Sequence, residues 1–80
     1  QNRAKEAQGS TQLTQRELEV LRWMADGKTD WEIGGILSIS ENTVRFHTKH
    51  IFQKLQVNTR LHAAVKAHMM GIADISHMSL

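Results

Sequence analysis

The stretch that decides the fold spans residues 31–55 and has the sequence WEIGGILSISENTVRFHTKHIFQKL. In its first part Ile33, Ile36 and Leu37 fall at i, i+3 and i+4, so we predict a short helix with these side chains facing a core. Ser40 then stands where its hydroxyl caps a second helix, and Ile39 packs into the corner before it. The second helix has an inward stripe at helical spacing: Val44, His47, Ile51 and Leu55. Two helices joined by a turn of about three or four residues form a helix-turn-helix.

The opposite face of the second helix, residues 41–55, carries mostly side chains that donate hydrogen bonds: Asn42, Arg45, Phe46, Lys49 and Gln53. A helix of this kind fits the major groove of DNA, where base edges are exposed. We predict base contacts for Arg45 and Lys49, which can donate to guanine O6 and N7, and for Asn42. Phe46 would pack against a thymine methyl group or a sugar, with core packing as its alternative. The alternative for Arg45 and Lys49 is phosphate contact without specificity, because phosphate bonds outnumber base bonds.

A second set of residues is predicted to contact the phosphate backbone. Thr43 lies in the first turn of the recognition helix, at the positive end of its dipole. Lys28, Thr29 and Trp31 open the preceding helix, which crosses the backbone in a helix-turn-helix. The remaining phosphate candidates are His50, Lys54 and Arg60. Helix capping alone is the alternative for Thr43, and covering the edge of the core is the alternative for Trp31.

Capping signals predict the limits of the helices. The pattern T-x-x-E occurs at Thr14 and again at Thr29, and each occurrence predicts a capping box. Gly27 and Gly71 supply left-handed residues that end helices, and Ile72 is placed for the contact of a Schellman motif. The predicted helices run from the Thr14 cap to residue 25, from about 30 to 37, from about 41 to 55, and from a cap at residue 58 or 59 through residue 68. The expected fold is therefore all-α, a four-helix domain with a central helix-turn-helix and no strand.

Two adjacent glycines lie inside the predicted helix 30–37, where each costs about 1 kcal/mol relative to alanine. We interpret Gly34 as a position that lets the recognition helix approach closely. For Gly35 we expect only a tolerated local weakness.

Length, composition and charge narrow the kinds of protein that this sequence can be. The 80 residues make one domain: 1–12 is predicted to be a linker or tail, 13–72 the folded domain and 73–80 a C-terminal tail. The chain has no cysteine, no membrane-spanning apolar run and no signal peptide, which favours a cytoplasmic protein. Its net charge is only +2, but residues 42–73 contain no acid, so one surface should attract a polyanion. From charge alone, a merely solvated basic face is an equal alternative.

Catalytic and metal-binding functions are disfavoured. The sequence lacks a cysteine nucleophile, a glycine-rich phosphate loop and a readable pair of carboxylates beside a histidine. His47 and His50 lie three residues apart, but no other ligand is near them in the sequence, and a structural zinc site needs four. We expect His47 to be a hydrogen-bonded structural residue. No enzyme activity, metal or cofactor is therefore predicted for this chain.

A series of short motifs along the chain matches the pattern of a known domain: LTxRE at 13–17, VL at 20–21, AxGK at 25–28, EI at 32–33, TVxxH at 43–47, Ile51, KL at 54–55 and Arg60. They cover about residues 13–72 and resemble the LuxR-type DNA-binding domain, of the winged-helix-like superfamily. Trp23, Trp31 and Phe46 narrow the resemblance to quorum-sensing regulators that carry an N-terminal acyl-homoserine-lactone domain. Two residues depart from the pattern, because alanine is usual at position 34 and asparagine is frequent at position 59.

The resemblance implies a transcription regulator that binds double-stranded DNA as a homodimer on a two-fold symmetric operator. Its lactone sensor would lie upstream of Gln1, and a start at Gln1 rather than Met favours a fragment. The last helix would form the dimer contact, with Leu61, Val65 and His68 as candidates, although Leu61 and Val65 fit the monomer core equally well. Two alternatives remain open: the output domain of a phosphorylated response regulator, and a helical interaction module that contacts RNA polymerase.

Overall fold

The computed structural model describes residues 12–72, and four helices make up the described part of the chain. They are α2 (Gln15–Ala25), α3 (Asp30–Leu37), α4 (Glu41–Leu55) and α5 (Arg60–Met69). The prediction of an all-α fold with a central helix-turn-helix is confirmed over these residues. Of the two predicted tails, only Gln12 belongs to the described part of the chain.

The helix starts follow the predicted capping signals. In α2 the Thr14 hydroxyl accepts from the Glu17 backbone N–H at 3.1 Å, and Glu17 accepts from the Thr14 N–H at 2.9 Å. The same reciprocal pair joins Thr29 and Glu32 at the start of α3, with distances of 3.1 and 2.8 Å. The hydrogen bond from the Thr29 N–H lowers the pKa of Glu32. Both capping boxes are therefore confirmed, and each gives two otherwise orphaned N–H groups a partner.

The remaining two helices begin with a single hydroxyl cap. The Ser40 hydroxyl accepts from the Thr43 N–H at 3.0 Å, and the Thr59 hydroxyl accepts from the His62 N–H at 3.1 Å. Thr59 thus caps α5 without the asparagine that the family often has there.

The helix ends use left-handed residues. Gly27 and Gly71 have φ of 93° and 77°, as predicted. After α5 the Ile72 N–H donates to the Ala67 carbonyl at 2.9 Å and the Gly71 N–H to the His68 carbonyl at 3.0 Å, which is a Schellman motif. At the end of α4 the left-handed position is instead occupied by Gln56, with φ of 59°. A non-glycine residue is strained in this conformation.

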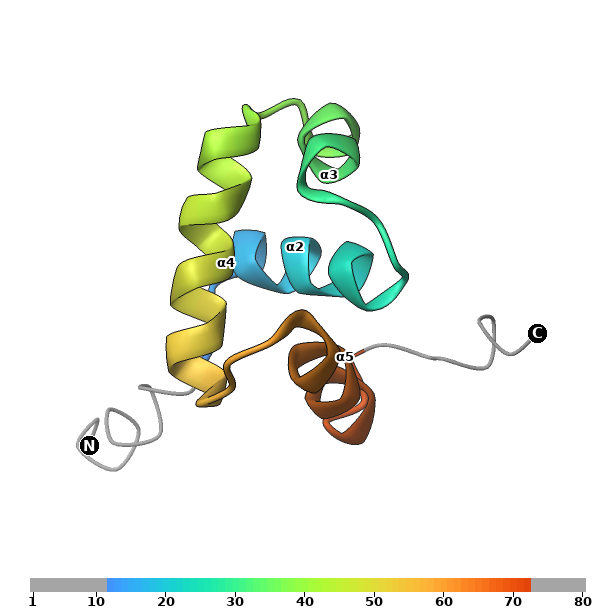
Figure 1. The fold of residues 1–80 in the computed structure, drawn as a ribbon, viewed down its shortest axis with the longest axis vertical. Helices are drawn as coiled ribbons and strands as arrows, with labels where there is room; N and C mark the ends of the chain where they lie inside the picture. The colour runs from blue at the N-terminus through green and yellow to red at the C-terminus, as the bar shows by residue number, and fades with distance from the viewer. Residues whose placement is uncertain (1–11, 73–80) are drawn as a thin grey trace.

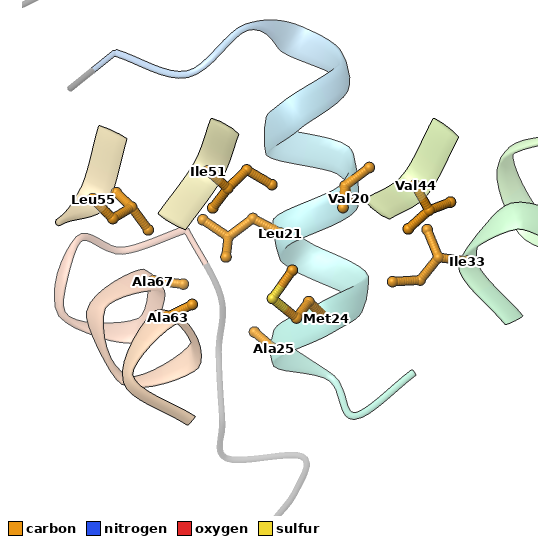
Figure 2. Close-up of a cluster of buried hydrophobic side chains, with 10 residues drawn as sticks. All are labelled: Val20, Leu21, Met24, Ala25, Ile33, Val44, Ile51, Leu55, Ala63 and Ala67. Carbon is orange, nitrogen blue, oxygen red and sulfur yellow. The ribbon is translucent and has the colours of Figure 1, made fainter. Parts of the chain in front are cut away.

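Helix α2 lies at the centre of the fold and packs against the three other helices. In Figure 1, α4 runs along one side of the molecule, with α3 near its start and α5 near its end. Figure 2 shows Ile33 and Val44 gathered beside Val20, while Leu55 and the alanines of α5 lie beyond Leu21. The largest completely buried side chains each contribute about 1.5–3 kcal/mol of hydrophobic stabilisation: Val20, Leu21, Ile33, Val44 and Ile51.

Gly34 marks the closest approach between α3 and the start of α4. A Cβ built on Gly34 would lie 2.7 Å from the Ile39 carbonyl oxygen, whereas one on Gly35 would meet nothing within 4 Å. Ile39 is half-buried against the core, which confirms its predicted place in the corner. The two interpretations of the paired glycines are also confirmed.

One predicted inward position was wrong, and the structure decides two positions that the sequence left open. Ile36 is exposed, because α3 packs against α4 through the face that carries Ile33, Gly34 and Leu37. Gly34 has no side chain, so α4 lies close to this face and Ile36 points away from it. In α5 the buried residues are Ala63 and Ala67, small enough to let this helix lie close to α2. Leu61 and Val65 are consequently exposed, so the alternative that placed them in the monomer core is excluded.

Candidate nucleic-acid interface

The helix-turn-helix is built by α3, a three-residue turn and α4. Ser38 adopts the left-handed conformation with φ of 61°, which reverses the chain after Leu37. The Ile39 N–H donates to the Gly34 carbonyl at 2.9 Å, and Ser40 then caps α4. These contacts fix how α4 leaves the turn, so its outward face is held rigidly relative to α3.

The outward face of α4 brings the four predicted base-contacting residues together. Asn42, Arg45, Phe46 and Lys49 are all exposed on this helix. The opposite face is anchored, since Val44 and Ile51 are completely buried and Leu55 nearly so. Phe46 is therefore not a core residue, and its core-packing alternative is excluded. The helix presents two cations, an amide and an aromatic ring to solvent, which are side chains suited to base edges.

Arg45 is surrounded by acceptors of its own chain. Its guanidinium donates to the Glu41 carboxylate at 2.7 Å and to the Asn42 amide oxygen at 3.0 Å. The Arg45 Nε atom also lies 3.8 Å from an oxygen of Asp30 on α3. The Arg45 side chain stays 55% exposed, so part of the guanidinium still faces solvent.

Phe46 forms an aromatic group with two histidines of the same helix. The Phe46 and His50 ring centroids are 4.4 Å apart, and those of Phe46 and His47 are 5.8 Å apart in an edge arrangement. His47 is half-buried rather than fully inward. Over residues 12–72 the structure gives its ring no hydrogen-bond partner, so the hydrogen bond of His47 stays a prediction. Its packing against Phe46 is the contact that the structure shows instead.

The predicted phosphate-contacting residues fall into two groups. Five of them lie on α3, on α4 or just before α3, with exposed or half-buried side chains: Lys28, Thr29, Trp31, Thr43 and His50. Trp31 is 73% exposed, which excludes its alternative role as a cover for the core. The hydroxyls of Thr43 and Ser40 lie 2.9 Å apart, at the positive end of the α4 dipole.

Lys54 and Arg60 form ion pairs within the fold. The Lys54 Nζ atom donates to Glu17 at 2.7 Å, joining α4 to the start of α2. Burial raises the pKa of Glu17, but the hydrogen bonds from Lys54 and from the Thr14 N–H outweigh that effect, so the pKa lies below its ordinary value of 4.5. Arg60 donates to Asp30 and to the Lys28 carbonyl, both at 2.9 Å, and so ties α5 to the start of α3.

Sequence reasoning missed the acidic partners of these cations. Glu17 and Lys54 are 37 residues apart and Asp30 and Arg60 are 30 apart, so no local pattern pairs them. The pairing of Glu41 with Arg45 had a signal, because an acid four residues before an arginine on a helix forms an ion pair.

Within residues 12–72, no three histidine, cysteine or acidic side chains gather as a metal site would require. Over the same residues, no helix is both long and apolar enough to cross a membrane.

The sequence of this chain is similar to those of known regulatory proteins. The family described as bacterial regulatory proteins, luxR family, matches residues 11–67. The transcriptional activator protein AnoR of Acinetobacter nosocomialis is 50% identical over 60 residues, which cover 75% of this chain and 25% of AnoR. The quorum sensing-dependent transcriptional regulator RpaR of Rhodopseudomonas palustris is 48% identical with the same coverages, as is the quorum-sensing regulator RhlR of Pseudomonas aeruginosa. The chain thus spans about a quarter of the length of these relatives. It belongs to the LuxR family of bacterial regulatory proteins, and its helix-turn-helix is the DNA-binding domain of that family.

Proposed function

We propose that this chain is the DNA-binding output domain of a quorum-sensing transcription regulator, which reads a specific operator by placing α4 in the major groove. The observation that carries the proposal is the division of α4 into a buried stripe and an exposed face with Arg45, Phe46 and Lys49. A rigidly anchored helix with such a face can position donors against base edges. The names of two relatives, RpaR and RhlR, support the quorum-sensing branch over a phosphorylated response regulator.

Four exposed residues of α4 have proposed roles. Arg45 and Lys49 donate to guanine O6 and N7, Asn42 contributes an amide beside them, and Phe46 packs on a thymine methyl group or sugar. The phosphate backbone is held by five residues on α3, on α4 and just before α3: Lys28, Thr29, Trp31, Thr43 and His50. For Lys54 and Arg60 we propose a structural role instead, because their cationic groups already bind Glu17 and Asp30.

The proposed assembly is a homodimer on a two-fold symmetric operator. Leu61, Val65 and Met69 lie four residues apart along α5, and they are 72%, 48% and 77% exposed. A second copy that covered this stripe would remove it from water. His68 would lie at the edge of the same contact. The two recognition helices would then be roughly 34 Å apart, one turn of DNA.

The rest of the regulator is also a proposal. Its signal would be an acyl-homoserine lactone bound by a separate N-terminal domain, because the relatives are about four times as long as the matched segment. The DNA-binding domain would work in the bacterial cytoplasm, at the nucleoid.

A contact with RNA polymerase is a second candidate function, favoured by one surface. Trp31 and Ile36 are exposed beside each other on α3, where they line an open hollow of about 360 Å³. Exposed apolar side chains of this size suit a protein partner. Trp31→Ala should then reduce activation of a reporter gene more than it reduces operator binding. Equal losses in both measurements would assign Trp31 to DNA alone.

The central proposal is tested by DNA binding across a salt series. The parent chain and an Arg45→Ala, Lys49→Ala variant are compared on a two-fold symmetric duplex, selected from a random pool by the parent, and on a scrambled duplex of equal composition. We expect the variant to lose discrimination between the two duplexes, because bidentate base contacts contribute about 1–3 kcal/mol each. If the variant binds both duplexes as the parent does, α4 is not the reading helix.

A further inference from the structure

The two cations on the outward face of α4 differ in their surroundings. Arg45 is held by Glu41 at 2.7 Å, by Asn42 at 3.0 Å and, more loosely, by Asp30 at 3.8 Å. Lys49 lies one helical turn further along the same face and is exposed. Among the described residues its ammonium group has no ion pair or hydrogen bond. One of the two groove-facing cations is thus restrained and the other is free.

The two carboxylates restrain Arg45 in different ways. Asp30 is anchored, because its other oxygen accepts from Arg60 at 2.9 Å and its side chain is only 19% exposed. It therefore cannot follow the guanidinium when Arg45 moves. Glu41 stands on the first turn of α4, four residues before Arg45, and its side chain is 40% exposed. Glu41 can accordingly keep its contact while the arginine reaches outward from the helix.

The donors left on Arg45 suffice for a bidentate contact with a base, and the neighbouring carboxylates oppose a contact with a phosphate. A guanidinium has five N–H groups, and the bonds to Glu41 and Asn42 occupy one on each terminal nitrogen. One N–H therefore remains on each terminal nitrogen, which is the number that guanine O6 and N7 accept. A phosphate approaching the same group would also approach two carboxylates of like charge, which opposes the contact.

We propose that Glu41 and Asp30 are specificity-determining residues, which hold Arg45 in place for a base edge and oppose its contact with phosphates. The inference rests on the proposed function, because it assumes that α4 enters the major groove. In this arrangement Lys49 supplies attraction to any DNA, while Arg45 favours the operator. The two carboxylates would lower affinity for random sequence more than affinity for the operator, and so raise the ratio between them.

The test uses the full chain with Glu41→Gln, which removes the charge at nearly constant shape. Binding is measured against the selected duplex and the scrambled duplex of equal composition, over a series of salt concentrations. We expect affinity for scrambled DNA to rise about threefold, the size of effect that an exposed ion pair allows. The logarithmic salt slope on scrambled DNA should steepen by about 0.9, because Arg45 becomes free to neutralise one more phosphate. Affinity for the selected duplex should stay level or fall.

Three further variants distinguish the restraint of Arg45 from a general change in charge and from simple repulsion of phosphates. Glu19→Gln removes the acid of the half-exposed Arg16–Glu19 pair on α2, a matched charge change outside the helix-turn-helix, and should leave the ratio of affinities unchanged. Asp30→Asn should lower the ratio as Glu41→Gln does. In an Arg45→Ala background, Glu41→Gln should have no effect on the salt slope. An equal rise in affinity in that background would show simple repulsion of phosphates and overturn the inference.

The remaining outcomes distinguish this inference from the proposed function. If Arg45→Ala reduces discrimination but Glu41→Gln and Asp30→Asn leave it intact, the carboxylates do not determine specificity and this inference alone fails. If Arg45→Ala leaves binding to both duplexes unchanged, the proposed role of α4 fails together with it. A thermal melt of each variant establishes that changes in affinity do not come from unfolding.

Discussion

Removing the ammonium group of Lys54 should destabilise the domain strongly, because it leaves the carboxylate of Glu17 buried without its cation. The pair is joined at 2.7 Å, with side chains that are 5% exposed for Glu17 and 27% for Lys54. Breaking a fully buried pair costs about 3–5 kcal/mol. Because Lys54 leaves water some access, we expect Lys54→Met to cost about 2 kcal/mol, a large share of the total stability of a domain this small. Methionine retains most of the apolar stem, so the loss reports the charge.

The measurement is thermal and urea unfolding followed by circular dichroism at neutral pH. We expect Lys54→Met to lower Tm by about 10 °C, since each kcal/mol shifts Tm by about 4–8 °C in a domain of this size. Arg16→Met, which removes the cation of the half-exposed Arg16–Glu19 pair, is the matched control and should cost under about 0.5 kcal/mol. Adding Glu17→Gln to Lys54→Met should restore most of the loss, because glutamine keeps the capping box without the charge.

The stability of the domain should depend on pH through the carboxyl group of Glu17. The pKa of Glu17 is held below 4.5 in the folded parent, so its contribution to stability is present above pH 4.5 and is lost as the pH falls through the folded pKa. In Lys54→Met, burial raises the pKa of Glu17 instead, so protonation relieves the buried charge. The difference in stability between parent and variant should therefore narrow on acidification. A Tm of Lys54→Met within 2 °C of the parent at neutral pH would refute this reasoning.

Four other substitutions test the fold and the assembly. Gly35→Ala should stabilise the domain by up to about 1 kcal/mol, because alanine has a higher helix propensity than glycine. Gly34→Ala should be less stable than Gly35→Ala, since its Cβ would lie 2.7 Å from the Ile39 carbonyl oxygen. Equal urea midpoints for the two variants would count against this close approach. Gln56→Gly should raise stability by about 1 kcal/mol by relieving the left-handed strain at φ 59°, and an unchanged urea midpoint would exclude that strain. Leu61→Asp should leave Tm nearly unchanged because the side chain is exposed, but should abolish self-association in sedimentation on operator DNA; a variant that still dimerises would place the contact elsewhere.

The local sequence determined the helices and their limits. The two T-x-x-E capping boxes, the cap at Ser40 and the glycines at 27 and 71 act over three to five residues, so their hydrogen bonds can be predicted without knowing the rest of the fold. The outward face of α4 could be predicted for the same reason, because a helix of 15 residues has a clear apolar stripe.

Only the tertiary structure decided the side chains whose surroundings come from other helices. Ile36 and Val65 have the residue type of a core position, but burial depends on where α2 and α4 lie, and that placed Gly34 and Ala63 at the contacts instead. The cations divided in the same way: Lys54 and Arg60 pair with carboxylates 37 and 30 residues away, while Lys49 is exposed on the outward face of α4. Residue type predicts that a side chain carries charge. Whether that charge is free for DNA or held by another helix depends on long-range packing, which periodicity along the chain does not encode.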